Sequence, residues 1–373
     1  MPADITPITM PKWGLTMTEG KVVTWLQQPG ASLSPGDELL EIETSKITNI
    51  FEAESSGTLA RIVAPEGSTL PIGGLLAVVA SPDTPDAEID AYVSGFVVPE
   101  PVDDASAESD APAPREIEAG GRRLRYLALG SGEAVPVLLL HGFGADLNTW
   151  MFTQPALSEG RPTVALDLPG HGGSTKDVGT GDVGLFADAV TTALAALGIS
   201  RAHLVGHSMG GAVALAVAAR DPSCVASVTA IASAGLGPDI NAAFIDGFIR
   251  AARRRDATEV LHMLVHDPSL VSRAMVEDVL RYKRLDGVAA ALNAIAQAWF
   301  GGGRQSVDLV DELGSIAAPV QLIWGRCDRI VPSAHAEALA SRVPVHILED
   351  TGHLPHMEKA GEVNRLLRRF VER

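Results

Sequence analysis

Residues 206–210 read GHSMG, and their surroundings constrain the fold more than any other feature of the chain. The apolar segment AHLVG leads into this motif. The helix-forming segment GAVALAVAAR begins at Gly211, directly after the motif. A serine between two glycines at a strand-to-helix junction is typical of a strained turn, which needs small residues because strand and helix lie close together. Such a turn presents Ser208 at the carboxyl end of a strand and at a helix N-terminus. We therefore expect Ser208 to be a nucleophile rather than a helix cap.

The sequence of residues 117–373 predicts an α/β fold. Its continuous apolar segments have the length of buried strands and alternate with alanine-rich segments of helical length, the pattern of a mostly parallel sheet covered on both faces. Strands are expected at residues 135–140, 161–167, 202–206, 228–233 and 320–325, and helices at residues 184–197 and 210–220. Residues 237–303 interrupt this alternation with amphipathic helical patterns and no clear strand, so we expect a helical lid there.

A serine hydroxyl becomes a good nucleophile when a base removes its proton and a carboxylate orients that base. Asp328 follows the expected strand VQLIWG, and His353 follows the strand VHILED in the loop TGHLPHMEK. The chain order Ser, Asp, His is that of one known triad arrangement. We expect Ser208, Asp328 and His353 to be catalytic, with His356 as the alternative base and Asp350 as the alternative acid.

The motif HGFG at residues 141–144 predicts an oxyanion hole, because it follows an expected strand and its glycines let backbone donors approach a reacting oxygen closely. The backbone N–H groups of Phe143 and Met209 are the expected donors. His171 lies in a second glycine-rich turn, DLPGHGGS, where we expect a structural histidine. Cys327 is expected to be a small buried residue rather than a second nucleophile. No metal site is expected.

The first 80 residues contain an internal repeat with an offset of 37 residues. EGKVVTWLQQPGASLSPGDELLEI aligns without a gap on SGTLARIVAPEGSTLPIGGLLAVV, with Gly20 on Gly57 and Gly30 on Gly67. Short alternating strands between Pro-Gly and Glu-Gly turns predict two similar antiparallel halves packed face to face, a flattened all-β barrel. Lys46 lies at the joint between the halves.

Charge and composition favour a second, extended region. Residues 81–116 carry 10 acidic and one basic side chain, and they are rich in Pro, Ala and Ser. This composition buries little apolar surface, so a flexible linker is expected. Within it, EIDAYVSGFVVPE has helical spacing, which predicts a segment packed on a neighbouring domain or, alternatively, one that docks a partner.

The whole-chain numbers exclude several classes of protein. A net charge of −17 leaves no basic surplus to neutralise phosphates, which argues against nucleic-acid binding. No apolar run is long enough to span a bilayer, and no export signal is visible at the N-terminus. Two cysteines make no disulfide framework, so we expect a cytoplasmic protein in a reducing compartment.

Two family resemblances rest on these motifs. HGFG, DLPGHGGS, GHSMG, the aspartate in WGRCDRIVP and the histidine in TGHLPHME resemble the α/β-hydrolase superfamily. MPKWGLTMTEGKVVTW, GDELLEIETSK and EGSTLPIGGLL resemble a biotinyl/lipoyl attachment domain, whose modified lysine matches Lys46. Biotin domains usually frame this lysine with methionines, which are absent here, so the resemblance implies covalent lipoate. The usual lipoyl signature has Asp before the lysine and Ala after it, where this chain has Ser45 and Ile47.

Together, the two halves resemble the dihydrolipoyllysine acetyltransferase subunits of acetoin dehydrogenase complexes. The resemblance implies an acyltransferase that moves an acetyl group from a lipoyl arm on Lys46 to coenzyme A. It also implies two partners, namely thiamin-diphosphate-dependent subunits that cleave acetoin and the flavoprotein dihydrolipoamide dehydrogenase. Other 2-oxo-acid dehydrogenase complexes use a core with a His-x-x-x-Asp-Gly motif, and neither that motif nor a peripheral-subunit-binding domain is evident in this sequence.

Two alternatives remain open from the sequence. The same acyl-enzyme could pass its acyl group to water, which would make the chain a lipoyl-tethered thioesterase or esterase. Alternatively, the chain could be a non-catalytic lipoyl carrier and scaffold, although the presence of Ser208, Asp328, His353 and HGFG together argues against that function.

Overall fold

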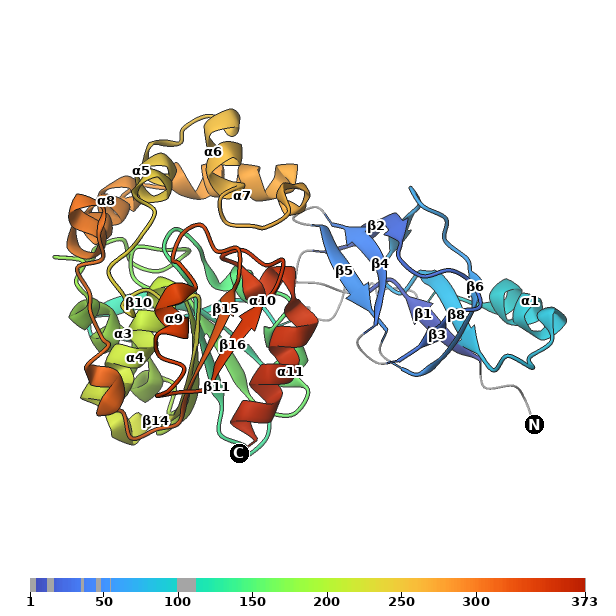
Figure 1. The fold of residues 1–373 in the computed structure, drawn as a ribbon, viewed down its shortest axis with the longest axis horizontal. Coiled ribbons are helices and arrows are strands. Elements are labelled where there is room, and N and C mark those ends of the chain that lie inside the picture. The colour runs from blue at the N-terminus through green and yellow to red at the C-terminus, as the bar shows by residue number, and fades with distance from the viewer. Residues whose placement is uncertain are drawn as a thin grey trace. The chain divides into compact units, whose positions relative to one another are not determined.

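The computed structural model describes residues 5–11, 17–34, 37–44, 48–53, 55–98 and 112–372. The chain divides into two compact units, one built mainly from residues up to 111 and the other mainly from residues 112 onward. Figure 1 shows that strands dominate the N-terminal unit, whereas the C-terminal unit combines a sheet with many helices.

Two four-stranded antiparallel sheets form the N-terminal unit, with strand orders β1-β8-β6-β3 and β5-β4-β2-β7. The strands are β1 (Thr6–Thr9), β2 (Glu19–Trp25), β3 (Ser32–Leu33), β4 (Glu38–Glu43), β5 (Thr48–Glu52), β6 (Gly57–Ile62), β7 (Thr69–Pro71) and β8 (Leu75–Ala80).

The internal repeat explains this arrangement. By the repeat, strand β2 corresponds to β6 and β4 to β8. Corresponding strands occupy the same position in the two different sheets. The repeated glycines Gly30 and Gly67 both adopt a positive φ, of 94° and 86°, which L-residues disfavour. Each half of the repeat therefore contributes strands to both sheets.

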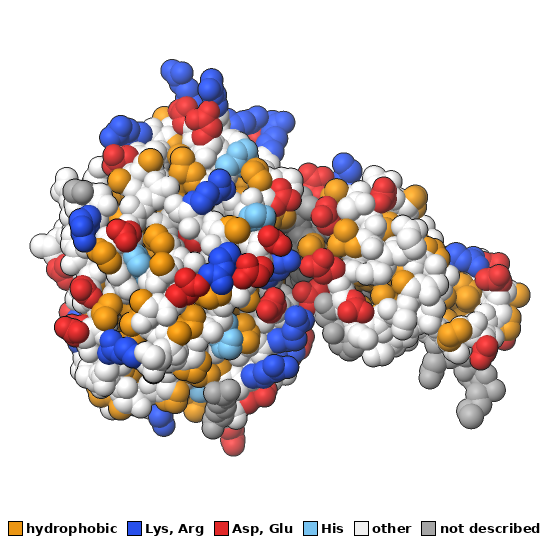
Figure 2. Space-filling model, in the orientation of Figure 1, with side chains coloured by type: hydrophobic (Ala, Val, Ile, Leu, Met, Phe, Trp, Pro, Cys, Tyr) orange, Lys and Arg blue, Asp and Glu red, His pale blue; other side chains and the backbone are white. Residues whose placement is uncertain are grey.

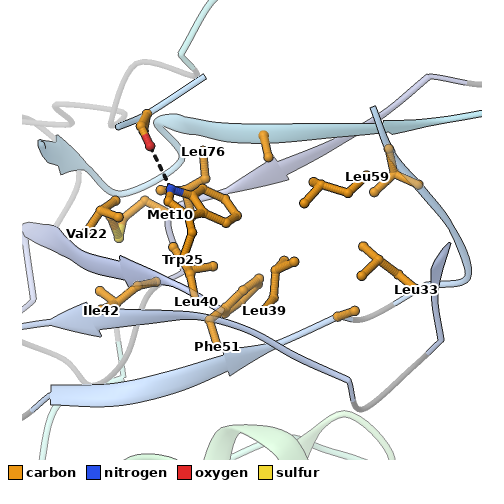
Figure 3. Packing of buried hydrophobic residues seen from close by; sticks show 14 of the residues in the cluster. Met10, Val22, Trp25, Leu33, Leu39, Leu40, Ile42, Phe51, Leu59 and Leu76 are labelled. Atoms are coloured by element: carbon orange, nitrogen blue, oxygen red, sulfur yellow. Dashed lines mark hydrogen bonds between the residues drawn. The ribbon is translucent and has the colours of Figure 1, made fainter. Parts of the chain in front are cut away.

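The core of this unit lies between the two sheets (Figure 3). Trp25 is its largest member, and its indole N–H donates to the Ala64 carbonyl at 2.9 Å, so burial leaves this polar group satisfied. Buried and exposed residues alternate in most of β2, as expected for a sheet with one buried face, whereas β8 is buried along its whole length. Aliphatic core residues that are fully buried include Val22, Leu39, Leu40, Ile42, Leu59 and Leu76.

The segment of helical spacing expected within the linker at residues 81–116 packs on a neighbouring domain, as predicted. Helix α1 (Asp86–Gly95) lies within this range and packs on the N-terminal unit, because Ile89 is buried against Leu75 and Val78 of β8. Arg61 also binds α1, at 3.0 Å from Asp86. At the other end, strand β9 already begins at Arg115. Residues 99–111 lie outside the described part of the chain.

An eight-stranded, mostly parallel sheet forms the centre of the C-terminal unit, in the order β16-β15-β14-β13-β11-β12-β10-β9. Strands β9 and β10 pair antiparallel at one edge. The strands are β9 (Arg115–Ala119), β10 (Arg122–Leu129), β11 (Val137–Leu140), β12 (Thr163–Leu166), β13 (Ala202–His207), β14 (Val225–Ile231), β15 (Val320–Gly325) and β16 (Val345–Leu348). Each strand predicted in this unit is present, and its ends lie within three residues of the predicted ends.

Helices cover both faces of this sheet, with α3 and α4 on one side and α11 on the other (Figure 1). The helices are α2 (Gln154–Ser158), α3 (Val183–Ala196), α4 (Met209–Arg220), α5 (Ala242–Arg250), α6 (Arg254–Leu261), α7 (Arg273–Lys283), α8 (Val288–Phe300), α9 (Ala334–Glu337), α10 (Pro355–Glu358) and α11 (Ala360–Val371). Short 3-10 turns lie at Leu147–Trp150, Pro222–Cys224, Pro268–Leu270, Gly301–Gly303 and Glu312–Gly314.

The region between β14 and β15 contains α5 to α8, which lie together at one end of the sheet (Figure 1). We call residues 237–303 the insertion. Its described residues hold four α-helices and no named strand, as the amphipathic pattern predicts. Lys283 of α7 fastens α5, because its ammonium group donates to the carbonyls of Phe248, Ile249 and Ala251 near the end of that helix.

Two observations concern nucleic-acid binding and membrane spanning, the classes that the sequence argues against. On the face of the C-terminal unit shown in Figure 2, basic and acidic side chains are interspersed, and they form no continuous patch of one sign. Among the described residues, no helix combines the length and the apolar character needed to cross a bilayer.

Candidate active site

Ser208 lies between β13 and α4 in a strained backbone conformation, with φ 53° and ψ −116°. Positive φ is uncommon for a residue with a side chain, so the surrounding structure must enforce it. The flanking glycines let the strand and the helix pack closely around this turn. A Cβ at Gly206 would overlap the Gly210 carbonyl, and one at Gly210 would overlap the Leu140 carbonyl. The turn has the geometry that GHSMG predicts, and it presents Ser208 at the carboxyl end of the sheet.

Asp328 and His353 meet although they follow different strands, β15 and β16. His353 Nδ1–H donates to Asp328 Oδ2 at 2.8 Å, and both side chains are almost fully buried. The other carboxylate oxygen of Asp328 accepts from the N–H groups of Ile330 and Val331, at 2.8 and 3.0 Å. The carboxylate is therefore held in place, and its bond to Nδ1 leaves Nε2 of His353 as the nitrogen that can accept a proton.

His207 joins the serine turn to the histidine loop. Its Nε2–H donates to the backbone carbonyl of His353 at 2.8 Å, and the two rings lie 4.8 Å apart between centroids. Because β13 and β15 are the neighbours of β14 in the sheet, Ser208 and Asp328 follow strands that end at the same edge. The residue before Ser208 is thus in direct contact with the proposed base.

The rival residues occupy other surroundings. His356 is fully buried, its Nε2 lies 3.1 Å from Thr149 Oγ1, and its ring packs on Trp150. Burial lowers the pKa of His356 to about 3, with a smaller contribution from the charge of His353. Asp350 has a positive φ of 50° and an exposed side chain 3.9 Å from His266. The geometry therefore favours His353 and Asp328 as base and acid.

The predicted oxyanion loop lies next to Ser208. A Cβ at Gly142 would lie 3.1 Å from that of Ser208, so the loop backbone and the serine turn are in contact. Met209 begins α4, where first-turn N–H groups have no acceptor within the helix. Phe143 and Met209 therefore belong to segments that adjoin Ser208, and their N–H groups stay the predicted oxyanion donors.

Two helices of the insertion contact this loop. The ring of Phe143 lies 5.9 Å from those of Phe248 on α5 and Phe300 on α8. Gly144, at φ 73°, leaves room for Phe248, whose ring would overlap any Cβ at that position. The aromatic contacts place the insertion against the oxyanion loop.

His171 has structural surroundings, as predicted, whereas Cys327 is not the buried residue that the sequence predicts. His171 is fully buried, its Nδ1–H donates to the Pro169 carbonyl at 2.9 Å, and its ring stacks on Tyr282 of α7. Burial holds the pKa of His171 well below its usual value, so the ring stays neutral. Cys327 is half-buried, and its N–H donates to the Thr351 carbonyl at 2.8 Å.

In the N-terminal unit, strands β4 and β5 flank the predicted attachment position. Strands β4 and β5 pair antiparallel, with Glu43 opposite Thr48, so Lys46 falls within the connection between them. Lys46, with Ser45 and Ile47, lies outside the described residues. No group of His, Cys, Asp and Glu side chains suited to a metal ion is present in the described ranges.

Sequence reasoning missed two residues at this site. The sequence gives no sign of a role for His207 in GHSMG or for Glu358 in TGHLPHMEK. In the structure, both side chains bond to the loop that carries His353. The signal available was a polar residue flanked by residues expected to be buried. Such a residue needs a hydrogen-bond partner, but the sequence does not identify that partner.

Family models match both units. One described as "alpha/beta hydrolase fold" matches residues 135–360, and one described as "Biotin-requiring enzyme" matches residues 6–79. Both fold predictions, a biotinyl/lipoyl-type domain followed by an α/β-hydrolase domain, are confirmed.

Two relatives match over the whole length. The chain is 45% identical to the "Dihydrolipoyllysine-residue acetyltransferase component of acetoin cleaving system" of Pseudomonas putida, and the match covers 100% of both chains. It is 44% identical to the component of the same name from Cupriavidus necator, over 98% of this chain and 97% of the relative.

Solved structures resemble the C-terminal unit. A bacterial membrane phospholipase A, described as a virulence factor, is 30% identical with a TM-score of 0.61, covering 70% of this chain and 86% of that chain. A meta-cleavage product hydrolase from Pseudomonas fluorescens IP01 has a TM-score of 0.63 over 69% of this chain and 97% of that chain. At 24% identity, the latter likeness shows the fold alone.

Proposed function

This chain belongs to the family of dihydrolipoyllysine-residue acetyltransferase components of acetoin cleaving systems, and from that premise we propose that it transfers an acetyl group from a lipoyl arm on Lys46 to coenzyme A. The observation that supports the proposal is the bonded pair of His353 and Asp328, which His207 connects to the strained turn at Ser208, in a chain that also has a lipoyl-type domain. We assign the catalytic roles to these three residues and the oxyanion hole to the N–H groups of Phe143 and Met209.

Lys46 fits the attachment of lipoate. The register of β4 and β5 brackets it in a short connection, and an amide on its side chain needs only an accessible amine. When bound, lipoate supplies a thiol that carries an acetyl group as a thioester.

The first half of the proposed reaction forms an acetyl-serine. Ser208 Oγ attacks the thioester carbonyl carbon while Nε2 of His353 takes the hydroxyl proton. The N–H groups of Phe143 and Met209 donate to the oxygen that becomes negative, and Asp328 stabilises the imidazolium. The C–S bond then breaks, the leaving sulfur takes the proton from His353, and the acetyl group remains on Ser208.

The second half reverses these roles. His353 takes the thiol proton of coenzyme A as its sulfur attacks the acetyl-serine, and it returns the proton to Ser208 Oγ when the ester bond breaks. Loss of one oxyanion donor in such a site costs about 10² to 10³ in rate. The remaining proposed partners are the acetoin-cleaving thiamin-diphosphate subunits and the flavoprotein dihydrolipoamide dehydrogenase.

The test follows acetyl groups from lipoylated, acetylated full-length protein with and without coenzyme A. We expect acetyl-coenzyme A to form at the expense of protein-bound acetyl, and Ser208→Ala to abolish its formation while lipoylation persists. Mass spectrometry checks lipoylation as a gain of about 188 Da on Lys46, the mass of lipoate less water. The exposed Ser223→Ala is the matched control and should retain full activity. Full acetyl transfer by Ser208→Ala would refute the covalent route.

A second function is favoured by the resemblance to solved hydrolases. The phospholipase A structure shares 30% of its aligned residues with this chain. If water is the acceptor, the chain is a lipoyl-tethered thioesterase or esterase, and the same assay would yield free acetate at a rate that coenzyme A does not change. A non-catalytic carrier would yield neither product.

A further inference from the structure

The backbone that carries His353 is fixed at three consecutive N–H groups. Those of Gly352 and Leu354 donate to Glu358 Oε1, at 2.9 and 3.2 Å. The N–H of His353 itself donates to the Leu264 carbonyl at 2.7 Å. Hydrogen bonds to a charged acceptor are about twice as strong as neutral ones, so Glu358 restrains the loop on both sides of the histidine.

The same carboxylate bonds to the insertion. Glu358 is 8% exposed, and its Oε2 accepts from the His266 N–H at 2.7 Å. The two segments are in contact, since a Cβ at Gly352 would lie 2.7 Å from the His266 nitrogen and 2.8 Å from the Leu264 oxygen. One buried side chain therefore joins the loop of the proposed base to residues 264–266 of the insertion.

Arg329 adds a second connection to this segment. Its guanidinium group donates to the Val265 carbonyl at 2.6 Å and to that of His262. Because Arg329 follows Asp328 in the chain, the segment after α6 is bonded beside both the proposed base and the proposed acid. Burial raises the pKa of Glu358, while its three N–H donors oppose this change by stabilising the carboxylate.

We propose that Glu358 is a positioning residue, which sets the orientation of His353 through the backbone and makes that orientation depend on residues 262–266 of the insertion. The proposal rests on the function proposed above for Ser208 and His353. Glu358 bonds to backbone N–H groups only, and it acts on the reaction through His353. A displacement of about 1 Å in a catalytic group can cost about 10² in rate, so loss of these bonds is expected to slow chemistry more than binding.

The test measures how fast a fluorophosphonate labels Ser208 in the full-length protein, because this reaction needs the serine and its base but neither lipoate nor coenzyme A. For Glu358→Gln, which keeps the size and loses the charge, we expect labelling to slow by about 10- to 100-fold. For p-nitrophenyl acetate, kcat should fall to a similar extent with KM within about twofold, and the pH profile of labelling should change. Glu349→Gln is the matched control, because Glu349 lies in the same loop with its side chain exposed, and it should label like the parent protein.

Each outcome decides the proposal. Labelling of Glu358→Gln within about twofold of the parent, or a loss equal to its unfolded fraction by circular dichroism, would overturn it. If this variant does not fold, Arg329→Gln tests the proposal instead, because it removes the bonds to residues 262–265 of the insertion. It should slow labelling several-fold, and unchanged labelling would overturn the proposal. If the parent protein itself is not labelled at Ser208, the proposed function fails and this inference fails with it.

Discussion

His356 makes the stability of the C-terminal unit depend on pH. It is fully buried between Trp150 and His207, with ring centroids 4.7 and 4.6 Å away. Burial lowers its pKa to about 3 in the folded protein, and the ordinary value of 6.5 applies to the unfolded chain. Below about pH 6.5 the unfolded chain therefore binds a proton that the folded protein does not bind until about pH 3.

The sign and size of the effect follow from this difference. The stabilising contribution of neutral His356 is fully present above about pH 6.5 and is lost as the pH falls from that value toward about 3. Between about pH 8 and about pH 5 the loss through this one ring is about 2 kcal/mol. His207 changes stability in the same direction, because burial also lowers its pKa well below the ordinary value.

The perturbation is His356→Gln, and the assay is urea unfolding of the full-length protein followed by far-ultraviolet circular dichroism. Of the described α-helices only α1 lies in the N-terminal unit, so this signal reports mainly on the C-terminal unit. The variant should be less stable than the parent at about pH 8, because it lacks the ring contacts, but it should lose about 2 kcal/mol less between about pH 8 and pH 5. His266→Gln, with a half-exposed side chain, is the control. An equal loss in parent and His356→Gln would refute the reasoning.

Three further predictions test the fold around the sites. Gly210→Ala should prevent folding of the C-terminal unit, at a cost above about 4 kcal/mol, whereas Gly160→Ala, which has open space around its Cβ position, should leave circular dichroism unchanged. Lys283→Met should lower the free energy of opening of α5 by about 1–3 kcal/mol, as measured by amide hydrogen exchange, and an unchanged rate would contradict the role of its three carbonyl contacts. Trp25→Phe should destabilise the N-terminal unit by about 1 kcal/mol through the lost bond to Ala64, seen as faster exchange in β2 and β6.

Local geometry was predictable where one short segment determines it. The glycines of GHSMG are required by contacts with backbone within the segment or the adjacent strand, so the turn at Ser208 could be anticipated. The 37-residue repeat likewise predicts two equivalent sheets, because each half encodes the same strands and turns. The relevant neighbour of Gly206 lies within the motif, that of Gly210 lies at the end of the adjacent strand β11, and the pairing of the sheets is implied by the repeat.

Interactions between distant residues could not be predicted in the same way. Glu358 bonds to the His266 N–H across 92 positions, and His207 bonds to the His353 carbonyl across 146. The helical spacing after Glu88 predicted a packed segment, but it did not show that Ile89 is buried on β8. Burial against a distant element decided each of these outcomes, and the local pattern carries little information about it.

Two of the contacts between the insertion and the proposed active site differ in their chemistry. Phe248 and Phe300 touch the oxyanion loop through ring contacts alone, which adjust to small shifts at low cost. Residues 262–266, by contrast, are bonded to the loop of His353 through Glu358, Leu264 and Arg329, and displacing them would leave several buried polar groups unpaired. Movement of the rings of Phe248 and Phe300 is therefore less costly than movement of residues 262–266. We therefore expect the loop of His353 to stay in place when these rings move.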